Sequence, residues 1–221
     1  MQKVLDYVSS SGWEFAEVLI VDDGSRDGTV ALAESWAARS PSVRVLRNPG
    51  NRGKGYAVRH GMLEGKGEWR LFTDADLSAP IEELDKLWAA VRDQGAQVAF
   101  GSRALDRSLV GVHQPFFREM TGRTFNLIMR AITGLPFHDT QCGFKLFSAA
   151  AAEAVFSRQL LERFGFDVEV LYIATRLGYQ ALEVPVRWND VLGTKVSLWS
   201  GVDAFADPLR VRINALRGRY R

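Results

Sequence analysis

Short apolar segments alternate with helix-like segments along the first half of this chain, and this alternation constrains the fold more than any other feature. Four runs are short, apolar and bounded by loops, as buried parallel strands are: 16–21, 43–46, 69–73 and 97–100. Helix-like stretches follow three of these runs, at 27–38, 53–63 and 81–92. Asp27 is a candidate N-cap, and Pro80 stands where a helix start tolerates proline. This order predicts an α/β fold with a mostly parallel sheet and helices on both faces.

The second half is less regular. Its patterns predict helices at 115–132, 149–157, 167–177 and 203–217 and strands at 143–147 and 181–186. Pro185 predicts an edge position for the last strand. Because no repeat or linker interrupts the chain, we expect one domain over residues 1–200 and a basic C-terminal helix or tail over 201–221.

The C-terminal segment is rich in arginine. Five arginines fall in the last twelve residues: Arg210, Arg212, Arg217, Arg219 and Arg221. Such a run suits an anionic membrane surface, and it equally suits a solvated chain end. The net charge of the whole chain is only +2, which argues against a nucleic-acid-binding protein.

Cysteine content and hydropathy bear on the compartment. Cys142 is the single cysteine, so no intramolecular disulfide can form and a reducing compartment is expected. No run approaches the roughly 18 to 20 apolar residues of a membrane span, and the N-terminus lacks a basic-then-apolar signal pattern. We therefore expect a cytoplasmic protein, with peripheral attachment to the cytoplasmic membrane face as a further expectation.

Acidic residues follow the predicted strands. Ligands of open α/β sheets bind beyond the carboxyl ends of the strands, so these positions are candidate binding residues. Asp74-Ala75-Asp76 follows the third strand, and two carboxylates on one side of a turn suit Mg²⁺ or Mn²⁺. The alternative is that this pair faces solvent or caps a helix.

Two further loops carry candidate binding groups. Asp22 and Asp23 follow the first strand, where one could form an Asx turn with Gly24 and the other could bind a base or ribose. The segment 51–55 places two glycines and two cations at a helix start, which favours an anion such as phosphate. A glycine-rich turn with solvated cations is the alternative.

Five motifs in order resemble family 2 glycosyltransferases of the GT-A fold, over about residues 1–190. They lie at residues 21–29, 51–55, 72–76, 101–103 and 139–145. The resemblance is nearest to the dolichyl- or polyprenyl-phosphate β-glucosyltransferases, with the polyprenyl-phosphate mannose synthases next. It implies a metal-dependent, inverting hexosyltransferase.

On the donor side, the resemblance assigns nucleotide-sugar binding to Asp22, Asp23, Lys54, Asp74 and Ala75. It places Asp23 at the nucleobase and Lys54 near the nucleotide. Asp74 and Asp76 would hold Mg²⁺ or Mn²⁺, with Asp76 the direct ligand. Ser78 stands where mannose synthases offer a glutamine to the metal.

On the acceptor side, the resemblance assigns the grip on a lipid phosphate to Arg103 and Arg118. For Arg118 a surface position on a helix is the alternative. Asp139 is a candidate base or orienting residue, or else a structural residue of the turn before Gly143. Asp76, Arg103 and Asp139 are therefore the candidate catalytic residues.

The implied reaction moves a hexose, with glucose favoured, from a UDP-glucose or GDP-mannose type of donor to a polyprenyl phosphate. An ionised phosphate acceptor needs no strong general base, so catalysis would depend on positioning and charge stabilisation. Two other hypotheses remain open: a family 2 transferase with a soluble sugar or protein acceptor, and an inactive truncated nucleotide-binding domain.

One element of the family pattern has no counterpart in the sequence. Family members open with a central strand that ends in a motif like Pro-Ala-Tyr-Asn-Glu, whereas residues 1–10 resemble the end of the helix that follows it. We therefore expect a GT-A domain that lacks its usual first strand, with unpaired backbone groups on the neighbouring strands. A chain start assigned too late, a truncation and a natural relic each explain this difference.

Overall fold

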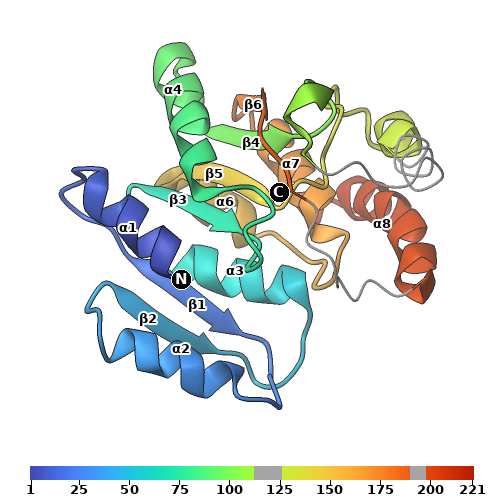
Figure 1. Ribbon diagram of the computed structural model, residues 1–221. Coiled ribbons are helices and arrows are strands. Elements are labelled where there is room, and N and C mark those ends of the chain that lie inside the picture. The colour runs from blue at the N-terminus through green and yellow to red at the C-terminus, as the bar shows by residue number, and fades with distance from the viewer. Residues whose placement is uncertain (112–125, 190–197) are drawn as a thin grey trace.

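The computed structural model describes residues 1–111, 126–189 and 198–221 (Figure 1). The strands are β1 Val18–Asp22, β2 Val43–Arg47, β3 Trp69–Thr73, β4 Val98–Ser102, β5 Phe144–Ser148 and β6 Ala181–Pro185. The α-helices are α1 Gln2–Ser10, α2 Thr29–Ala37, α3 Lys54–Glu64, α4 Leu84–Gln94, α6 Ala149–Phe156, α7 Phe166–Arg176 and α8 Leu198–Leu216. Two short 3-10 helices are η1 Ile81–Glu83 and η2 Arg107–Leu109.

The described elements follow the predicted order. Residues 126–133 are also helical, and the predicted helix over 115–132 otherwise lies outside the described residues. The predicted N-cap Asp27 is wrong by one residue: α2 begins at Thr29 with Gly28 as its N-cap, and the Asp27 carboxylate, one residue further out, accepts a hydrogen bond from the Thr29 amide at 3.0 Å. The α/β prediction is confirmed.

The strands form two hydrogen-bonded ladders. One is the parallel pair β1 and β2, and the other has the order β3-β5-β4-β6. β5 is antiparallel to both β3 and β4, while β4 and β6 are parallel. The strands of the larger ladder other than β5 thus share one direction, and β6 is at its edge, as Pro185 predicts.

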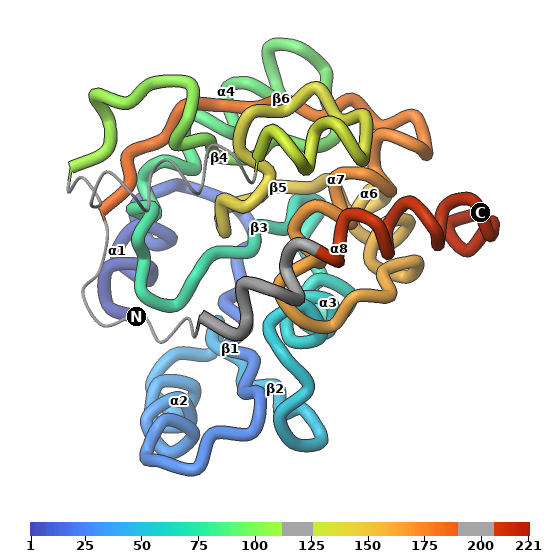
Figure 2. The backbone as a smooth tube through the Cα atoms, turned by 90° about the vertical axis from the view of Figure 1, so that its right-hand side faces the viewer, coloured from blue at the N-terminus to red at the C-terminus, as the bar shows by residue number. Residues whose placement is uncertain are grey.

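The division falls between β1 and β3. Within the described part of the chain, no strand pairs with the second edge of either one. Figures 1 and 2 show the β1–α2–β2 unit set apart from the larger ladder, with α3 beside it. This division lies where the resemblance expects a central strand to be missing.

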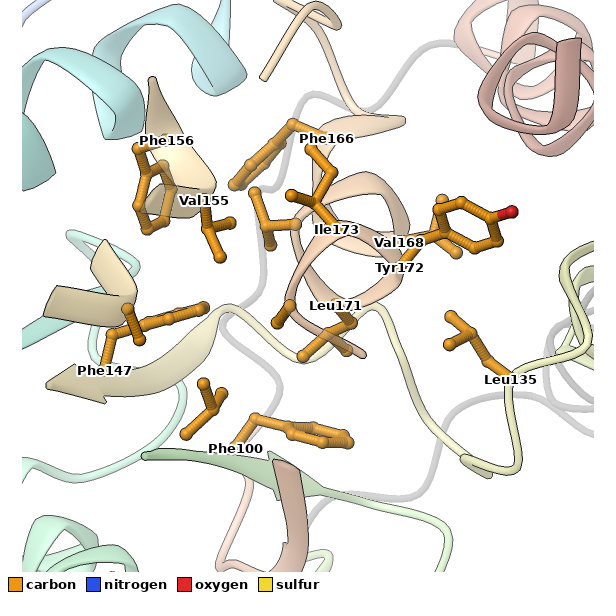
Figure 3. Packing of buried hydrophobic residues seen from close by; sticks show 14 of the residues in the cluster. Phe100, Leu135, Phe147, Val155, Phe156, Phe166, Val168, Leu171, Tyr172 and Ile173 are labelled. Atoms are coloured by element: carbon orange, nitrogen blue, oxygen red, sulfur yellow. The ribbon is translucent and has the colours of Figure 1, made fainter. Parts of the chain in front are cut away.

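Strand periodicity places two apolar cores on the two faces of the larger ladder. Phe100 and Phe147 point to a core formed with α3, α6 and α7, and Figure 3 shows their packing with Phe156 and Phe166. The opposite core lies beneath α4 and α1. It contains Ala99, which precedes Phe100 in β4, together with Phe144 and Leu146 of β5. Helices therefore cover both faces, and the site can form only at the strand ends.

The C-terminal segment packs against the first of these cores. Val211 and Ala215 of α8 are buried there with Tyr220, which follows the helix. The Tyr220 hydroxyl donates a 2.7 Å hydrogen bond to the buried Glu169 carboxylate of α7. No helix within the described residues combines the length and apolar character that a membrane span requires.

The buried bond between Tyr220 and Glu169 predicts a stability effect. Tyr220→Phe leaves part of a buried carboxylate without its donor, so we expect the free energy of unfolding to fall by about 1–3 kcal/mol in urea denaturation. Tyr179→Phe is the matched control, because its hydroxyl makes an exposed 3.4 Å contact with the Ala150 carbonyl. An equal effect of the two substitutions would contradict the importance of the Tyr220 bond.

Candidate functional site

The loops that follow the strands meet at an ion pair. Lys54, the first residue of α3, places its Nζ 2.6 Å from Oδ1 of Asp74, which follows β3. Burial lowers the pKa of Lys54, but the negative charges of Asp167 and Asp74 outweigh it, so the net pKa is raised and the ammonium stays charged. The pair joins the glycine-rich loop to the metal motif predicted from the sequence.

Asp74 is also held by the loop that precedes β5. Its amide donates to the Gly143 carbonyl at 3.1 Å, and a Cβ on Gly143 would lie 2.3 Å from Asp74 Oδ2. A side chain at Gly143 would therefore displace the Asp74 carboxylate. Glycine at this position is explained by the space that the carboxylate needs.

The rest of the motif forms a tight turn. Oδ1 of Asp76 accepts hydrogen bonds from the Ser78 amide and hydroxyl, both at 2.9 Å. Leu77 between them has a φ of 52°, in the left-handed region that bulky residues rarely adopt. Ala75 and Asp76 are exposed. Strain of this kind is held by surrounding contacts and occurs often at functional loops.

The two carboxylates of the motif fit a hard divalent cation whose remaining ligands come from a substrate phosphate and from water. Asp74 and Asp76 are the carboxylates in reach of this turn, and no group of three or more acidic, histidine or cysteine ligands occurs among the described residues. Mg²⁺ is commonly held by one or two carboxylates together with substrate phosphates and water. A protein-only metal cage would need more ligands than this loop provides.

The two carboxylates after β1 have different partners. Asp22 forms the Asx turn, accepting from the Gly24 and Ser25 amides at 3.1 Å each. Hydrogen bonds from Ser25 and Gly24 hold its pKa below the ordinary value. Asp23 instead accepts from Asn48 Nδ2 at 2.8 Å and from backbone amides of the next loop.

Those backbone amides belong to the glycine-rich segment. The Arg52 and Gly53 amides donate to Asp23 at 3.0 and 2.7 Å, so an internal carboxylate occupies the anion position at the start of α3. Gly53 and Gly55 lie against the loop that precedes α7, where an added Cβ would come within 2.6 Å of the Glu162 and Leu161 carbonyls respectively. The structure therefore shows a structural reason for both glycines.

Arg103 and Asp139 form a second ion pair at the strand ends. Asp139 Oδ2 accepts from Arg103 Nε at 2.7 Å, and Oδ1 accepts from Nη2 at 2.8 Å. The guanidinium carbon also lies 4.9 Å from the centre of the Trp188 ring. Burial raises the pKa of Asp139, but the positive charge and hydrogen bonds of Arg103 outweigh it, so the net pKa is below its usual range.

Sequence reasoning missed the residue that holds this loop. Glu183 of β6 accepts from the Asp139 amide at 2.7 Å, the His138 amide at 2.9 Å and the Ser102 hydroxyl at 2.7 Å. The sequence signal was a charged residue inside an otherwise apolar strand pattern. Thr140 was also missed: its hydroxyl is buried and has no hydrogen-bond partner among the described residues.

A buried ion pair lies in the same region. Lys145 of β5 is fully buried, and its Nζ donates to the Cys142 carbonyl at 2.7 Å and to the Asp167 carboxylate. Asp167 lies in the first turn of α7. The structure thus brings together Lys54, Asp74 and Gly143, and separately Arg103 and Asp139, while Arg118 lies outside the described residues.

The lowered pKa of Asp139 predicts a pH dependence of stability. Its carboxylate stabilises the fold above the ordinary pKa of about 4, and this contribution is lost as the pH falls through the lower native value. Asp139→Asn should lower the free energy of unfolding by about 3–5 kcal/mol at pH 7, because it leaves Arg103 without its charge partner. The difference from wild type should narrow below pH of about 4.

Urea denaturation between pH 3 and 8 measures this difference. Asp93→Asn is the control, since Asp93 pairs with Arg92 at an exposed position and should leave the profile unchanged. A difference between wild type and Asp139→Asn that stays constant with pH would contradict the ion-pair explanation.

The chain is similar to curated enzymes over nearly its whole length. It is 38% identical to the dolichyl-phosphate beta-glucosyltransferase of Drosophila melanogaster over 216 residues, which are 93% of this chain and 65% of that protein. It is 36% identical to the human protein of the same name, with 93% of this chain and 66% of that one covered. The chain therefore spans about two thirds of the length of these relatives.

Solved structures with low sequence identity share the fold. A mannosyl-3-phosphoglycerate synthase from Rubrobacter xylanophilus has a TM-score of 0.65 at 16% identity, covering 98% of this chain and 68% of that one. A glucosyl-3-phosphoglycerate synthase from Mycobacterium tuberculosis in complex with uridine diphosphate has a TM-score of 0.63 at 19% identity, with 99% and 74% covered. These neighbours are GT-A glycosyltransferases, which confirms the expected fold.

The family is shown by both the length of the match and the relatives. The family model described as Glycosyl transferase family 2 matches residues 1–156, well over half of the chain. The strand-end loops with Asp23, Lys54, Asp74 and Asp139 lie inside that match. The chain belongs to glycosyl transferase family 2.

Proposed function

We propose that this chain transfers glucose from a nucleotide sugar to dolichyl phosphate or another polyprenyl phosphate, with inversion at the anomeric carbon. The observation that carries the proposal is the Lys54–Asp74 ion pair, because it brings the glycine-rich loop and the carboxylate motif to one edge of the sheet. The relatives at 36% and 38% identity are named for this activity. UDP-glucose and GDP-mannose are the two donor types that the site would accommodate.

Asp74 and Asp76 would hold a Mg²⁺ or Mn²⁺ ion shared with the donor diphosphate. The mannosyltransferase of Pyrobaculum calidifontis, 18% identical with a TM-score of 0.63, was solved with GDP-Man and Mn²⁺, and the chains are covered to 98% and 59%. When bound, such an ion stabilises the negative charge that builds up on a departing diphosphate. Lys54 would add a positive charge beside the same phosphates. Its ion pair with Asp74 would then weaken, because the ammonium group would also contact the phosphates.

Asp23 would orient the nucleobase end of the donor. It already fixes the segment 51–53 through two amide hydrogen bonds. Its proposed role is therefore to shape the loop that borders the base as well as to contact it. Asp22 supports Asp23 through its Asx turn, and Ala75, without a bulky side chain, would allow the sugar to approach the turn.

Arg103 would grip the acceptor phosphate together with Arg118. A guanidinium has five N–H donors, and Asp139 uses one on Nε and one on Nη2, which leaves the Nη1 side to face a phosphate. The pairing supports an orienting role for Asp139 rather than that of a base, since a carboxylate with a lowered pKa accepts protons poorly near neutral pH.

The bond changes are those of a single in-line displacement. A phosphate oxygen of the acceptor forms a bond to the anomeric carbon while the bond from that carbon to the diphosphate oxygen breaks. The nucleoside diphosphate leaves with the electron pair. Because the acceptor is already ionised, no proton has to move, and the protein contributes positioning and charge stabilisation.

This reaction implies a cytoplasmic enzyme that works peripherally at a membrane face, where a polyprenyl phosphate presents its headgroup. A family 2 transferase with a soluble acceptor is a second candidate, since the two synthases with solved structures are named for phosphoglycerate products. A domain with weak or no activity by itself is a third, favoured by the division of the described sheet between β1 and β3.

Substitution of Asp76 tests the proposed metal ligand. With UDP-glucose, Mn²⁺ and dolichyl phosphate in detergent, wild type should release UDP, and Asp76→Ala should reduce kcat/KM by roughly 100-fold or more. Asp106→Ala is the matched control, because Asp106 accepts from the Ser108 amide and hydroxyl just as Asp76 accepts from those of Ser78. Its activity should equal that of wild type.

Two readouts separate the candidate functions. Calorimetry with UDP and Mn²⁺ should detect binding to wild type that Asp76→Ala weakens, and full activity of Asp76→Ala would refute the metal assignment. UDP release with a soluble sugar phosphate but not with dolichyl phosphate would favour the second candidate. Absence of any binding at millimolar UDP would favour the third.

A further inference from the structure

The C-terminal segment presents an exposed face of unusual composition. Leu209, Ile213 and Leu216 of α8 are 53%, 45% and 79% exposed. The five arginines of the segment are exposed as well: Arg210, Arg212, Arg217, Arg219 and Arg221. Large aliphatic side chains on a solvated helix face, beside several cations, indicate a surface that contacts something other than water.

The helix geometry orders this face. At about 100° per residue, Leu209, Ile213 and Leu216 fall within a stripe roughly 60° wide. Arg212 lies about 40° outside that stripe on one side, and Arg210 about 60° outside it on the other. The apolar stripe is therefore flanked by arginine positions on both sides, and we call this surface the α8 face.

The opposite side of the same helix is fixed to the protein. Val211 and Ala215 belong to the buried core, and the Tyr220 hydroxyl is bound to Glu169. Arg212 Nη1 donates to the Tyr172 hydroxyl at 3.2 Å. In both views α8 lies at the periphery of the molecule, and its C-terminal end projects at the right of Figure 2. The α8 face is thus held rigidly outward.

Negative charge is nearly absent from this segment. Asp207 is the one acidic residue in the sequence from 206 to 221, and it is buried and paired with Arg210 at 2.8 Å. The exposed charge on the α8 face is therefore entirely positive. Its complement is an anionic surface with an apolar layer beneath it.

We propose that the α8 face docks on the surface of an anionic phospholipid bilayer. The three aliphatic side chains would enter the boundary between headgroups and acyl chains, as those of interfacial amphipathic helices do. The arginines would lie at the level of the lipid phosphates, which planar guanidinium groups bind by paired hydrogen bonds. α8 lies in the plane of the membrane in this arrangement and does not span it.

Charge argues against a second copy of the chain as the occupant. A two-fold contact would place the same patch on both partners, so that arginines would face arginines with no exposed acidic residue of residues 206–221 between them. Anionic lipids provide the opposite charge and the apolar layer together. The inference concerns binding alone, and its test requires no turnover of substrate.

Vesicle co-sedimentation of the full chain tests the proposal. Wild type should bind vesicles of phosphatidylcholine with 30 mol% phosphatidylserine, and the binding should weaken strongly between roughly 0.1 and 0.5 M NaCl because salt screens the arginines. Binding to pure phosphatidylcholine should be at least roughly ten-fold weaker. Equal binding to both kinds of vesicle would overturn the proposal.

Two groups of variants separate the apolar and charged contributions. The first group replaces the three stripe residues Leu209, Ile213 and Leu216 with serine and should lower vesicle binding by at least roughly ten-fold. The second replaces Arg217, Arg219 and Arg221 by glutamine and should lower binding by roughly five-fold for each arginine removed. Their matched controls change exposed residues elsewhere: Leu32, Leu105 and Leu177 to serine, and Arg26, Arg92 and Arg176 to glutamine.

The controls should bind as wild type does, with every variant checked for an unchanged thermal midpoint. Binding of the serine triple equal to wild type would refute the role of the stripe. Sedimentation of wild type as a dimer, with the serine triple monomeric, would show that a second copy covers the α8 face and would likewise overturn the proposal. Because vesicle binding is measured without donor or acceptor, an inactive chain could still pass this test.

Discussion

The buried ion pair between Lys145 and Asp167 is the constraint around which the larger ladder is arranged. Lys145 is the second residue of β5, a strand with a neighbour on each edge, and is fully buried. An unpaired ammonium group at such a position would cost several kcal/mol. Asp167 must therefore come to it, which fixes the first turn of α7 against β5 and places that turn near the ends of the strands.

The direction of β5 then builds the site. Because β5 is antiparallel to β3, the register that pairs Thr73 with Phe144 sets the residue after β3 beside the residue before β5. Asp74 and Gly143 meet for this reason, and glycine leaves room for the carboxylate. If β5 were parallel to β3, the loop before β5 would lie at the opposite ends of the strands, away from Lys54.

Much of this could be predicted from the sequence. Apolar periodicity located the strands and helices, the rule that ligands bind at strand ends selected Asp23 and Asp74, and the glycine-rich helix start indicated Lys54. What it could not predict were contacts between residues distant in sequence. Asp23 binds the amides of residues 52 and 53, and Glu183 holds the Asp139 loop from 44 residues away. Neither of these two contacts follows from periodicity or from local turn chemistry. The same is true of α8, where the pattern predicted a basic helix but the core that Val211 and Ala215 enter is visible only in the packing.

The two separate ladders have a consequence for local opening. Amides that exchange by sub-global unfolding do so in cooperative units, and strands within one ladder usually share a unit. Within the described residues, β1 and β2 pair with each other and neither pairs with β3. The backbone amides of β1 and β2 can therefore exchange hydrogen at a different rate from those of the larger ladder. Asp23 follows the one ladder and Asp74 the other, and α3, whose first residue Lys54 pairs with Asp74, contacts strands of both. Local opening of the β1–β2 ladder would then release the loop of Asp23 while the loop of Asp74 stays in place.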